Sequence, residues 1–444
     1  MAVAPTAVPS PAPAPKRISW AVVGDLDPSK FSVAPPPTDA ASLAQEQAEM
    51  RALRGNLTKQ QREAIAAWDT GYILRWNQVA RDAVAKSRLD PLNASELYAL
   101  LSVAQYNILL ATDAYQRSFA RHPLAESAGG VAPLVTLTTA GTYPSEHAAI
   151  AAAAEVLLTA FSPEQADRFR QLRAEAQRSR MWAGVSTHSD IDAGATLGQA
   201  IAQTLLDQAR ANLAAAAWNI PTPKGPGYWS RSIAPYKSPL LPVWGNMHPW
   251  LLERTDQFLA PPPPAFDSAE FKRALQEVRT FSDNRTAEQL RIAQFWGDGS
   301  GTAGPPGHWN QIAADLITAR ALDDRETAQI LAYLNMALMD AGISCWNTKF
   351  TYWVIRPSQA DPAITTPVGL PNFPAYTSGH ASFSGAAAAF LGSRFPEERE
   401  KLFAMAEEAA MSRLYGGIHY RFDGVNGLKA GQAIGELAAQ RMGQ

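Results

Sequence analysis

The sequence predicts an all-α fold made of two helical bundles, on three observations. Apolar residues recur at helical spacing in segments such as 42–55, 94–115 and 325–342, and period-two alternation is almost absent. A stretch rich in Pro, Gly and Trp, residues 217–266, cannot be helical and divides the chain. Short motifs of the first part recur in the second. We expect two bundles related by internal duplication, packed as one globular unit with a Pro-rich connection.

Composition limits the classes of protein that this chain can be. It has 444 residues, of which 46% are hydrophobic and 18% charged, so it is long enough for two core-forming units. A net charge of -2 gives no basic field for nucleic acid, and no run of 18 apolar residues is free of charges, which argues against a transmembrane segment. Cys345 stands alone, which excludes a disulfide framework and a thiolate metal site. We therefore expect small-molecule partners.

The chain divides into four parts along its length. Residues 1–38 are predicted to be a flexible Pro/Ala-rich tail, because they lack the continuous apolar core of a secretory signal. Residues 39–216 form the expected N-terminal bundle, 217–266 the connection and 267–444 the C-terminal bundle. Predicted helix caps are Asn93, Ser162, Asp267 and Asp324.

Three blocks of the first part match three blocks of the second at one offset. RWNQVA (75–80) matches HWNQIA (308–313), TYPSEHA (142–148) matches AYTSGHA (375–381), and GQAIAQ (198–203) matches GQAIGE (431–436), each 233 residues later. Three matches in the same order are difficult to obtain by chance. We infer an internal duplication, with the second copy described first because it carries more chemistry.

The stretch AYTSGHASF, residues 375–383, places a serine, a glycine and a histidine at an expected helix start. Unpaired backbone N–H groups and the helix dipole favour an anion there, the hydroxyl of Ser378 adds a donor, and Gly379 lets the anion approach the main chain. An ordinary N-cap serine with an incidental histidine, His380, is the simpler interpretation of the motif by itself. Neighbouring segments decide between the two.

Charged residues on both sides of this motif favour the anion site. KFTYWVIRP supplies Lys349 and Arg356, and Pro357 should end the helix there. SRLYGGIHYRFDG supplies Arg413, His419 and Asp423, with two glycines that break the helix and an Asp placed to accept from the imidazole. Three fixed cations match a tetrahedral oxyanion of two or three negative charges. The segment should therefore bind phosphate or an isostere of phosphate.

The ordered set Lys-x6-Arg-Pro, Ser-Gly-His and Ser-Arg-x5-His-x3-Asp resembles the signature shared by vanadium-dependent haloperoxidases and the acid and lipid phosphatases of the same fold. It is most similar to the chloroperoxidase-like branch, whose two-bundle all-helical architecture fits the inferred duplication. Thr377 departs from the usual proline before Ser-Gly-His, which removes a fixed φ angle from the loop.

The resemblance implies a role for each matched position. Equatorial oxygens of vanadate, or of phosphate in the same site, would be held by Lys349, Arg356, Ser378, Gly379 and Arg413. His419 would be the axial ligand of vanadium, or the nucleophile of a phosphatase. Asp423 would fix the tautomer of His419, and His380 would be the acid–base group, with Lys349 or His380 polarising a bound oxygen.

Three further positions are implied by the same resemblance. Trp346 and Phe373 lie where chloroperoxidase-type members carry aromatic residues beside the halide, although core packing explains buried aromatics equally well. Asp298, in FWGDG, would be a carboxylate that orients the arginines, or else an ordinary loop cap.

In the first copy the matching positions predict a site that has lost its anion. Glu146 replaces the glycine, Gln116 lies at the offset position of Lys349, and Arg121 is followed by a shifted proline. STHSDID keeps His188 and Asp192 at the x3 spacing, but Arg180 stands eight residues before that histidine. We expect His147 and His188 to be structural. A second metal or oxyanion site made of Glu146, His147, His188 and Asp192 is the competing hypothesis.

The preferred function is vanadate-dependent oxidation of halide by hydrogen peroxide, with vanadium acting as a Lewis acid. An acid phosphatase that hydrolyses phosphate esters through a phosphohistidine is the alternative. A non-catalytic phosphate-binding protein comes third, because mere binding would not need both histidines and Asp423. The sequence leaves homodimerisation open. Export to the periplasm or the exterior, with a signal absent from this chain, is favoured over the cytoplasm because hypohalous acid is safer outside the cell.

Overall fold

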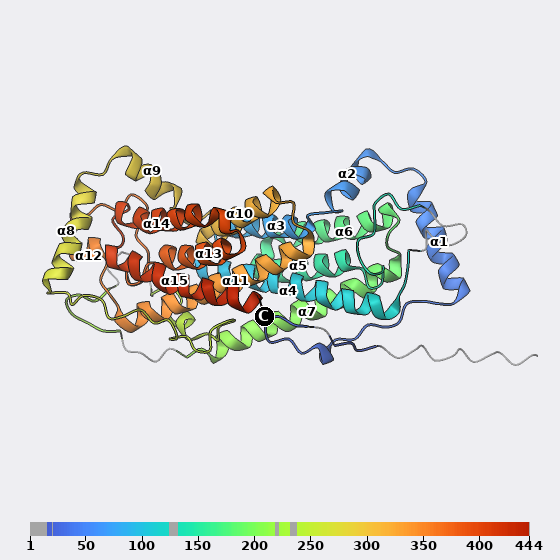
Figure 1. Ribbon diagram of the computed structural model, residues 1–444, viewed down its shortest axis with the longest axis horizontal. Helices are drawn as coiled ribbons and strands as arrows, with labels where there is room; N and C mark the ends of the chain where they lie inside the picture. The colour runs from blue at the N-terminus through green and yellow to red at the C-terminus, as the bar shows by residue number, and fades with distance from the viewer. Residues whose placement is uncertain (1–15, 20, 124–131, 218–221, 231–237, 444) are drawn as a thin grey trace, which may run out of the picture. The chain divides into compact units, whose positions relative to one another are not determined.

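The computed structural model describes residues 16–19, 21–123, 132–217, 222–230 and 238–443 (Figure 1). These residues form helices and irregular segments, and within them the only β-type pairings are two isolated bridges, Lys16 with Val33 and Tyr228 with Val354. The predicted all-α class is confirmed. No helix within the described ranges combines the length and the apolarity that crossing a bilayer requires.

Fifteen α-helices are found in the described part of the chain. Their bounds are α1 Ala40–Arg54, α2 Lys59–Ala67, α3 Tyr72–Ser87, α4 Pro91–Phe119, α5 Glu146–Phe161, α6 Ala166–Ala183, α7 His188–Ala215, α8 Ala269–Asp283, α9 Ala287–Phe295, α10 Gly304–Ala319, α11 Asp324–Tyr352, α12 Pro357–Ala360, α13 Gly379–Arg394, α14 Arg399–Tyr415 and α15 Arg421–Met442. Short 3-10 turns stand at Pro28–Lys30, Pro163–Gln165, Pro242–Asn246 and Pro396–Glu398.

The chain forms two compact units, which do not follow chain order. The first unit comprises Met1–Tyr72, Asn107–Val156 and Arg168–Gln203, and the second comprises Ile73–Tyr106, Leu157–Asp167 and Thr204–Gln444. Helix α3 and the first half of α4 therefore belong with the helices of the C-terminal part.

Most of the predicted helix caps are displaced by one or more residues. Ser268, not Asp267, caps α8, and Asp323, not Asp324, caps α11. Helix α4 begins at Pro91, and the side chain of Asp90 accepts from the N–H groups of Leu92 and Asn93. Ser162 precedes a 3-10 turn and makes no capping bond through its side chain. In three of these cases an adjacent or nearby residue of the same chemical type takes the cap, and sequence alone does not distinguish such neighbours.

The predicted flexible tail is wrong for its second part. Leu26, Phe31 and Val33 are buried, and the Tyr115 hydroxyl donates to the carbonyl oxygens of Lys16 and Phe31 at 3.2 Å each. The apolar residues of 21–38 give this segment area to bury, which the Pro/Ala repeat before it lacks. The first fifteen residues lie outside the described part of the chain.

The Pro-rich connection packs along the second unit, apart from 218–221 and 231–237, which lie outside the described residues. The Trp229 N–H donates to the Trp353 oxygen at 2.7 Å, and the Leu240 N–H donates to the Asn372 oxygen at 3.0 Å. The buried carboxylate of Asp340 accepts from three consecutive N–H groups, those of residues 250–252. These bonds satisfy backbone groups that a non-helical segment would otherwise leave unpaired.

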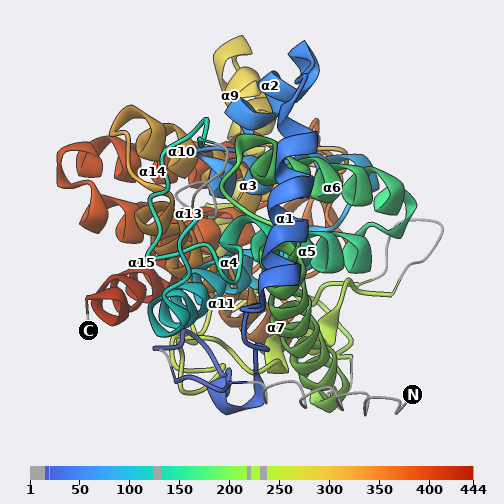
Figure 2. The same cartoon turned by 90° about the vertical axis from the view of Figure 1, so that its right-hand side faces the viewer.

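Helix α13 forms the centre of the second unit and packs against α15, α14 and α11 (Figure 1). The contact with α15 is close, since a Cβ built on Gly431 would lie 2.2 Å from the Ser382 oxygen. The first unit has the same feature between α5 and α7, where a Cβ on Gly198 would lie 1.9 Å from the Ala149 oxygen (Figure 2). Glycine is required at both points because any side chain would force the helices apart.

Candidate active site

The site is built on the start of α13. Ser378 caps this helix, its hydroxyl oxygen accepting from the Ala381 N–H at 3.4 Å, while its own N–H donates to the Asp423 oxygen at 3.0 Å. Gly379 is the first helical residue, and a Cβ there would meet only Trp346, at 3.7 Å. The first N–H groups of the helix thus lie beside the segment that carries Asp423, in a setting suited to an anion.

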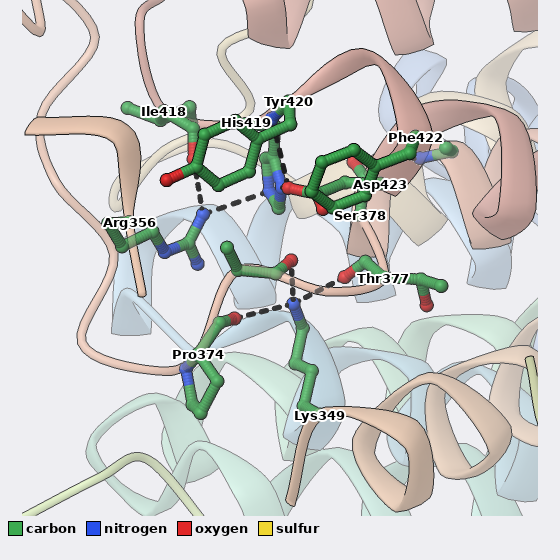
Figure 3. Close-up of polar contacts among 12 residues, drawn as sticks. Lys349, Arg356, Pro374, Thr377, Ser378, Ile418, His419, Tyr420, Phe422 and Asp423 are labelled. Carbon is green, nitrogen blue, oxygen red and sulfur yellow. Dashed lines mark hydrogen bonds and ion pairs between the residues drawn. The ribbon is translucent and has the colours of Figure 1, made fainter. Parts of the chain in front are cut away.

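Lys349 lies in the last turn of α11 and is fully buried. Its Nζ donates to the carbonyl oxygens of Pro374 at 2.8 Å, Ala375 at 3.0 Å and Thr377 (Figure 3). Burial lowers the pKa of this ammonium, although the carbonyl dipoles stabilise its charge. Lys349 therefore fixes the loop that leads into Ser378 as well as placing a positive charge below it.

Arg356 reaches the same place from outside the helix. Helix α11 ends at Tyr352, and not at Arg356 as Pro357 predicts, because Trp353 adopts a left-handed conformation with φ 53°. The guanidinium of Arg356 donates through Nε to the Phe373 oxygen at 2.9 Å. Its Nη2 is buried and has no hydrogen-bond partner among the described residues, so one strong donor is left for a guest.

The imidazole of His419 is held between an acceptor and a donor. Its Nδ1 lies 2.8 Å from the Asp423 Oδ2, and its Nε2 lies 3.0 Å from the Arg356 Nη1, which also donates to the Ile418 oxygen at 2.7 Å (Figure 3). Burial lowers the pKa of His419 far below its ordinary value, an effect that the charge of Arg356 reinforces, and burial raises the pKa of Asp423. A neutral ring with Nδ1–H on the carboxylate leaves the Nε2 lone pair to act as ligand or nucleophile.

Arg413 and His380 complete the ring of polar groups. Arg413, near the end of α14, donates through Nε to the Ser412 hydroxyl at 2.8 Å and through Nη2 to the Ala293 oxygen at 2.7 Å. No partner is found for its Nη1 within the described part of the chain. The Nε2 of His380 is likewise buried without a hydrogen-bond partner, and burial lowers the pKa of both side chains, that of Arg413 to about 10.

Aromatic rings form one wall of this site. The rings of Trp346 and Phe373 lie 4.9 Å apart, and the Phe373 ring is 5.0 Å from both the Lys349 Nζ and the Arg356 Cζ. The Trp346 indole donates to the Leu240 oxygen of the connection at 3.1 Å. Contact with two cations goes beyond core packing and gives these rings a place at the anion site.

Asp298 does not take the position that the sequence interpretation gave it. Its carboxylate lies 3.1 and 3.2 Å from the Nδ1 of His308 and makes no hydrogen bond to Arg356 or Arg413 within the described residues. His308 forms no ligand-spaced pair in the sequence, so its partner was missed there. A spacing of ten residues across a Gly-rich loop gives no periodic signal that would have indicated the contact.

The residues brought together fit a tetrahedral oxyanion such as vanadate or phosphate. Two guanidinium nitrogens without partners, the Ser378 hydroxyl, the start of α13 and the buried ammonium of Lys349 offer donors and positive charge. The imidazole Nε2 of His419 supplies the additional bond that vanadium accepts. No set of three or more His, Cys, Asp or Glu residues able to hold a metal ion occurs in the described ranges.

The corresponding helix start of the first unit has different chemistry. Gln116 donates to the Pro144 oxygen at 3.0 Å, the place that Lys349 fills in the second unit. Arg180 is paired with Asp69, its Nη1 lying 2.8 Å from Oδ1. The carboxylate of Glu146 accepts a hydrogen bond from Tyr72.

The x3 spacing of His188 and Asp192 proves misleading. Their side chains pair on the surface at 3.1 Å, 62% and 66% exposed, far from a buried histidine–aspartate pair in character. Asp190 instead holds the place of Asp423, since it accepts from the Thr187 N–H at 2.7 Å as Asp423 accepts from the Tyr420 N–H at 3.0 Å. The offset of 233 residues would have identified Asp190. A second site that includes His188 is not formed.

Comparisons with known proteins agree with the motifs. Residues 329–443 match the family model described as PAP2 superfamily. The vanadium chloroperoxidase of Curvularia inaequalis is 29% identical in a region covering 34% of this chain and 32% of that protein, so the match spans about a third of this relative.

Two solved structures share the fold. One, the first bacterial vanadium-dependent iodoperoxidase, has a TM-score of 0.67 and 25% identity, covering 84% of this chain and 96% of that one. The other, a holo-type bacterial vanadium-dependent chloroperoxidase, has a TM-score of 0.58 and 14% identity, covering 80% and 93%. The resemblance to the vanadium haloperoxidase and phosphatase superfamily is confirmed, with the catalytic reaction still open between its branches.

Proposed function

We propose that the protein is a vanadate-dependent haloperoxidase, which oxidises halide with hydrogen peroxide. The observation that carries the proposal is the buried set of Lys349, Arg356 and Arg413 around the start of α13, beside an imidazole whose Nε2 lone pair is exposed to the same space. The aromatic wall and the likeness to an iodoperoxidase over most of both chains favour the peroxidase branch.

The overall reaction combines halide, hydrogen peroxide and one proton to give hypohalous acid and water. Halide loses two electrons and the peroxide O–O bond is reduced. Bound vanadate would supply a Lewis acid that activates the peroxide oxygen. The ring of cations would hold its oxygens, with Arg356 Nη2 and Arg413 Nη1 donating, and His419 Nε2 would bind its central atom.

Proton movement falls to the chain itself. Because burial keeps His380 neutral at ordinary pH, its Nε2 can take up a proton and return it to a departing oxygen. Asp423 keeps the proton of His419 on Nδ1, which leaves Nε2 as a lone pair throughout. Burial of all these groups excludes water, which strengthens each charge interaction.

A phosphatase using the same residues is the second candidate. The PAP2 superfamily match of 329–443 favours it, and the same Nε2 lone pair of His419 could attack phosphorus, with His380 protonating the leaving alkoxide.

One pair of assays on dialysed protein separates these functions. Orthovanadate should switch on bromide or iodide oxidation by peroxide and should inhibit any hydrolysis of an aryl phosphate. Hydrolysis of the phosphate ester with no halide oxidation at any vanadate concentration would assign the phosphatase function instead. Binding of phosphate or vanadate without either reaction would leave a binding protein.

A further inference from the structure

We infer that His308 is a positioning residue, which holds the carboxylate of Asp298 away from Arg413 and so keeps that guanidinium free for the oxyanion. The inference rests on the proposed function, because it concerns a group that would bind the same anion.

The geometry around His308 fixes both partners. Its Nδ1 faces both carboxylate oxygens of Asp298, at 3.1 and 3.2 Å. The imidazole is stacked on Trp296, with ring centroids 4.5 Å apart and planes 18° from parallel, and meets the edge of Phe295 at 5.1 Å. Asp298 adopts φ 41°, a conformation that costs free energy for any residue with a side chain, so the turn toward His308 must be stabilised by its contacts.

The loop that carries Asp298 is attached to the same surface as Arg413. The Trp296 indole donates to Glu408 of α14 at 2.9 Å, and Arg413 Nη2 donates to the Ala293 oxygen at 2.7 Å. The negative charge of Asp298 opposes the effect of burial on the pKa of Arg413, which places the two groups within electrostatic reach. They nevertheless make no hydrogen bond within the described residues.

The first unit shows what an aspartate at this place does without such a partner. There the Trp68 indole donates to Glu175 at 2.8 Å and Arg180 Nη2 donates to the Ile65 oxygen at 2.9 Å, the same two attachments. Asp69, directly after Trp68, pairs with Arg180 Nη1 at 2.8 Å.

Two differences account for the change in the second unit. Gly297 is inserted between the tryptophan and the aspartate, and the loop continues through a Gly-rich segment to His308. The carboxylate thereby gains a different acceptor geometry and a different donor. If His308 is removed, the nearest strong donor for Asp298 is Arg413, and a buried arginine–carboxylate pair must then be broken before an oxyanion can bind.

Binding measurements test this directly. Orthovanadate and, separately, inorganic phosphate are titrated calorimetrically into the full chain and into His308→Ala, Asp298→Asn and the double variant. We expect His308→Ala to weaken binding at least about tenfold, and the double variant to return to the level of Asp298→Asn, within about threefold of the unchanged chain. His308→Gln keeps an N–H donor and should bind nearly normally, and His248→Ala, an exposed histidine of the connection, is the matched control.

A crystal structure of His308→Ala supplies a readout independent of anion binding. The Asp298 carboxylate should lie within hydrogen-bond distance of Arg413 Nη1, as Asp69 lies beside Arg180. The inference is overturned if Asp298 stays turned away, or if the double variant binds as weakly as His308→Ala. A chain that binds neither anion, yet shows the new ion pair, would overturn the proposed function and keep this inference.

Discussion

The helix starts of α5 and α13 share a backbone setting and differ in charge. Ser145 donates its N–H to the Asp190 oxygen at 2.9 Å, and Ser378 donates its N–H to the Asp423 oxygen at 3.0 Å. Around Ser145 the cations are replaced or paired, while around Ser378 they converge on one place. The fold therefore provides a pocket at a helix start, and the surrounding side chains determine whether it can hold an anion.

The first unit shows that this fold does not depend on free cations. Arg121 pairs with Asp190 at 3.1 Å and with Glu46, and Arg180 pairs with Asp69. Each ion pair removes a positive charge from the pocket without loss of the helices. The charges of the second unit are retained for binding, since clustering them raises the free energy of the folded state.

The largest expected effect follows from removing the imidazole that distinguishes the two sites. His419→Ala should lower vanadate-dependent halide oxidation by about a thousandfold or more, because the bond to the central atom is lost. Initial rates at saturating vanadate measure this. Ser186, which stands at the offset position in the first unit, gives the matched control, and Ser186→Ala should keep activity within about twofold. Activity of a tenth or more in His419→Ala would show that this ring is not the ligand.

Making the second site resemble the first at Lys349 should have the next largest effect. Lys349→Gln removes a buried charge and two of the three bonds to the loop, so vanadate affinity should fall about a hundredfold. Equilibrium dialysis gives both the affinity and the stoichiometry, which should be one vanadate per chain. The reverse change, Gln116→Lys, should leave that stoichiometry at one, because Arg180 stays paired. Two bound vanadates in the unchanged chain would refute the contrast between the units.

A carboxylate at the helix start tests the same contrast with a smaller effect. Gly379→Glu copies Glu146 into the second site and should weaken vanadate binding by about ten- to thirtyfold through like-charge repulsion. Gly379→Ala is the steric control, since its Cβ would meet Trp346 at an ordinary 3.7 Å. Equal losses in the two variants would mean that space, and not charge, explains the glycine. Dissociation constants from calorimetry distinguish these outcomes.

The smallest expected effect concerns stability and pH in the first unit. Burial, reinforced by Arg180, lowers the pKa of His147 from 6.5 to about 3. Between those values the unfolded chain binds a proton that the folded chain does not, so stability is present above pH 6.5 and is lost as pH falls toward 3. His147→Gln should reduce this slope by up to about 1.4 kcal/mol per pH unit. Urea unfolding at pH 7, 6 and 5 measures it, with exposed His188→Gln as the control, which should keep the original slope.

Much of the fold and of the anion site could be predicted from sequence because the signals are local. Helical periodicity identifies the class, and a Ser-Gly pair before an apolar run identifies the start of α13. The histidine and aspartate of the axial pair lie four residues apart, which places Asp423 beside His419. The internal duplication stays a prediction, and contacts such as Asn77 with Asn310, 233 residues apart, are of the kind it requires.

Other features depend on contacts that spacing does not encode. Asp298 turns to His308 through a left-handed backbone conformation, which no motif announces. The three carbonyl partners of Lys349 depend on how the loop before Ser378 folds back on α11. For Asp190 the error was one of method, because an equal spacing on one helix was preferred to the offset shared by the whole copy.

The glycine contact between α13 and α15 has a consequence for engineering. Gly431 lets the two helices approach until a Cβ would lie 2.2 Å from the Ser382 oxygen, and this approach sets the distance between the Ser378 turn and the imidazole of His419. A single added methyl group there would widen that distance without touching any reacting atom. Libraries for directed evolution of halide preference should therefore keep this seam unchanged and vary the aromatic wall, because diversity at the seam would yield inactive clones whose lesion lies far from the chemistry.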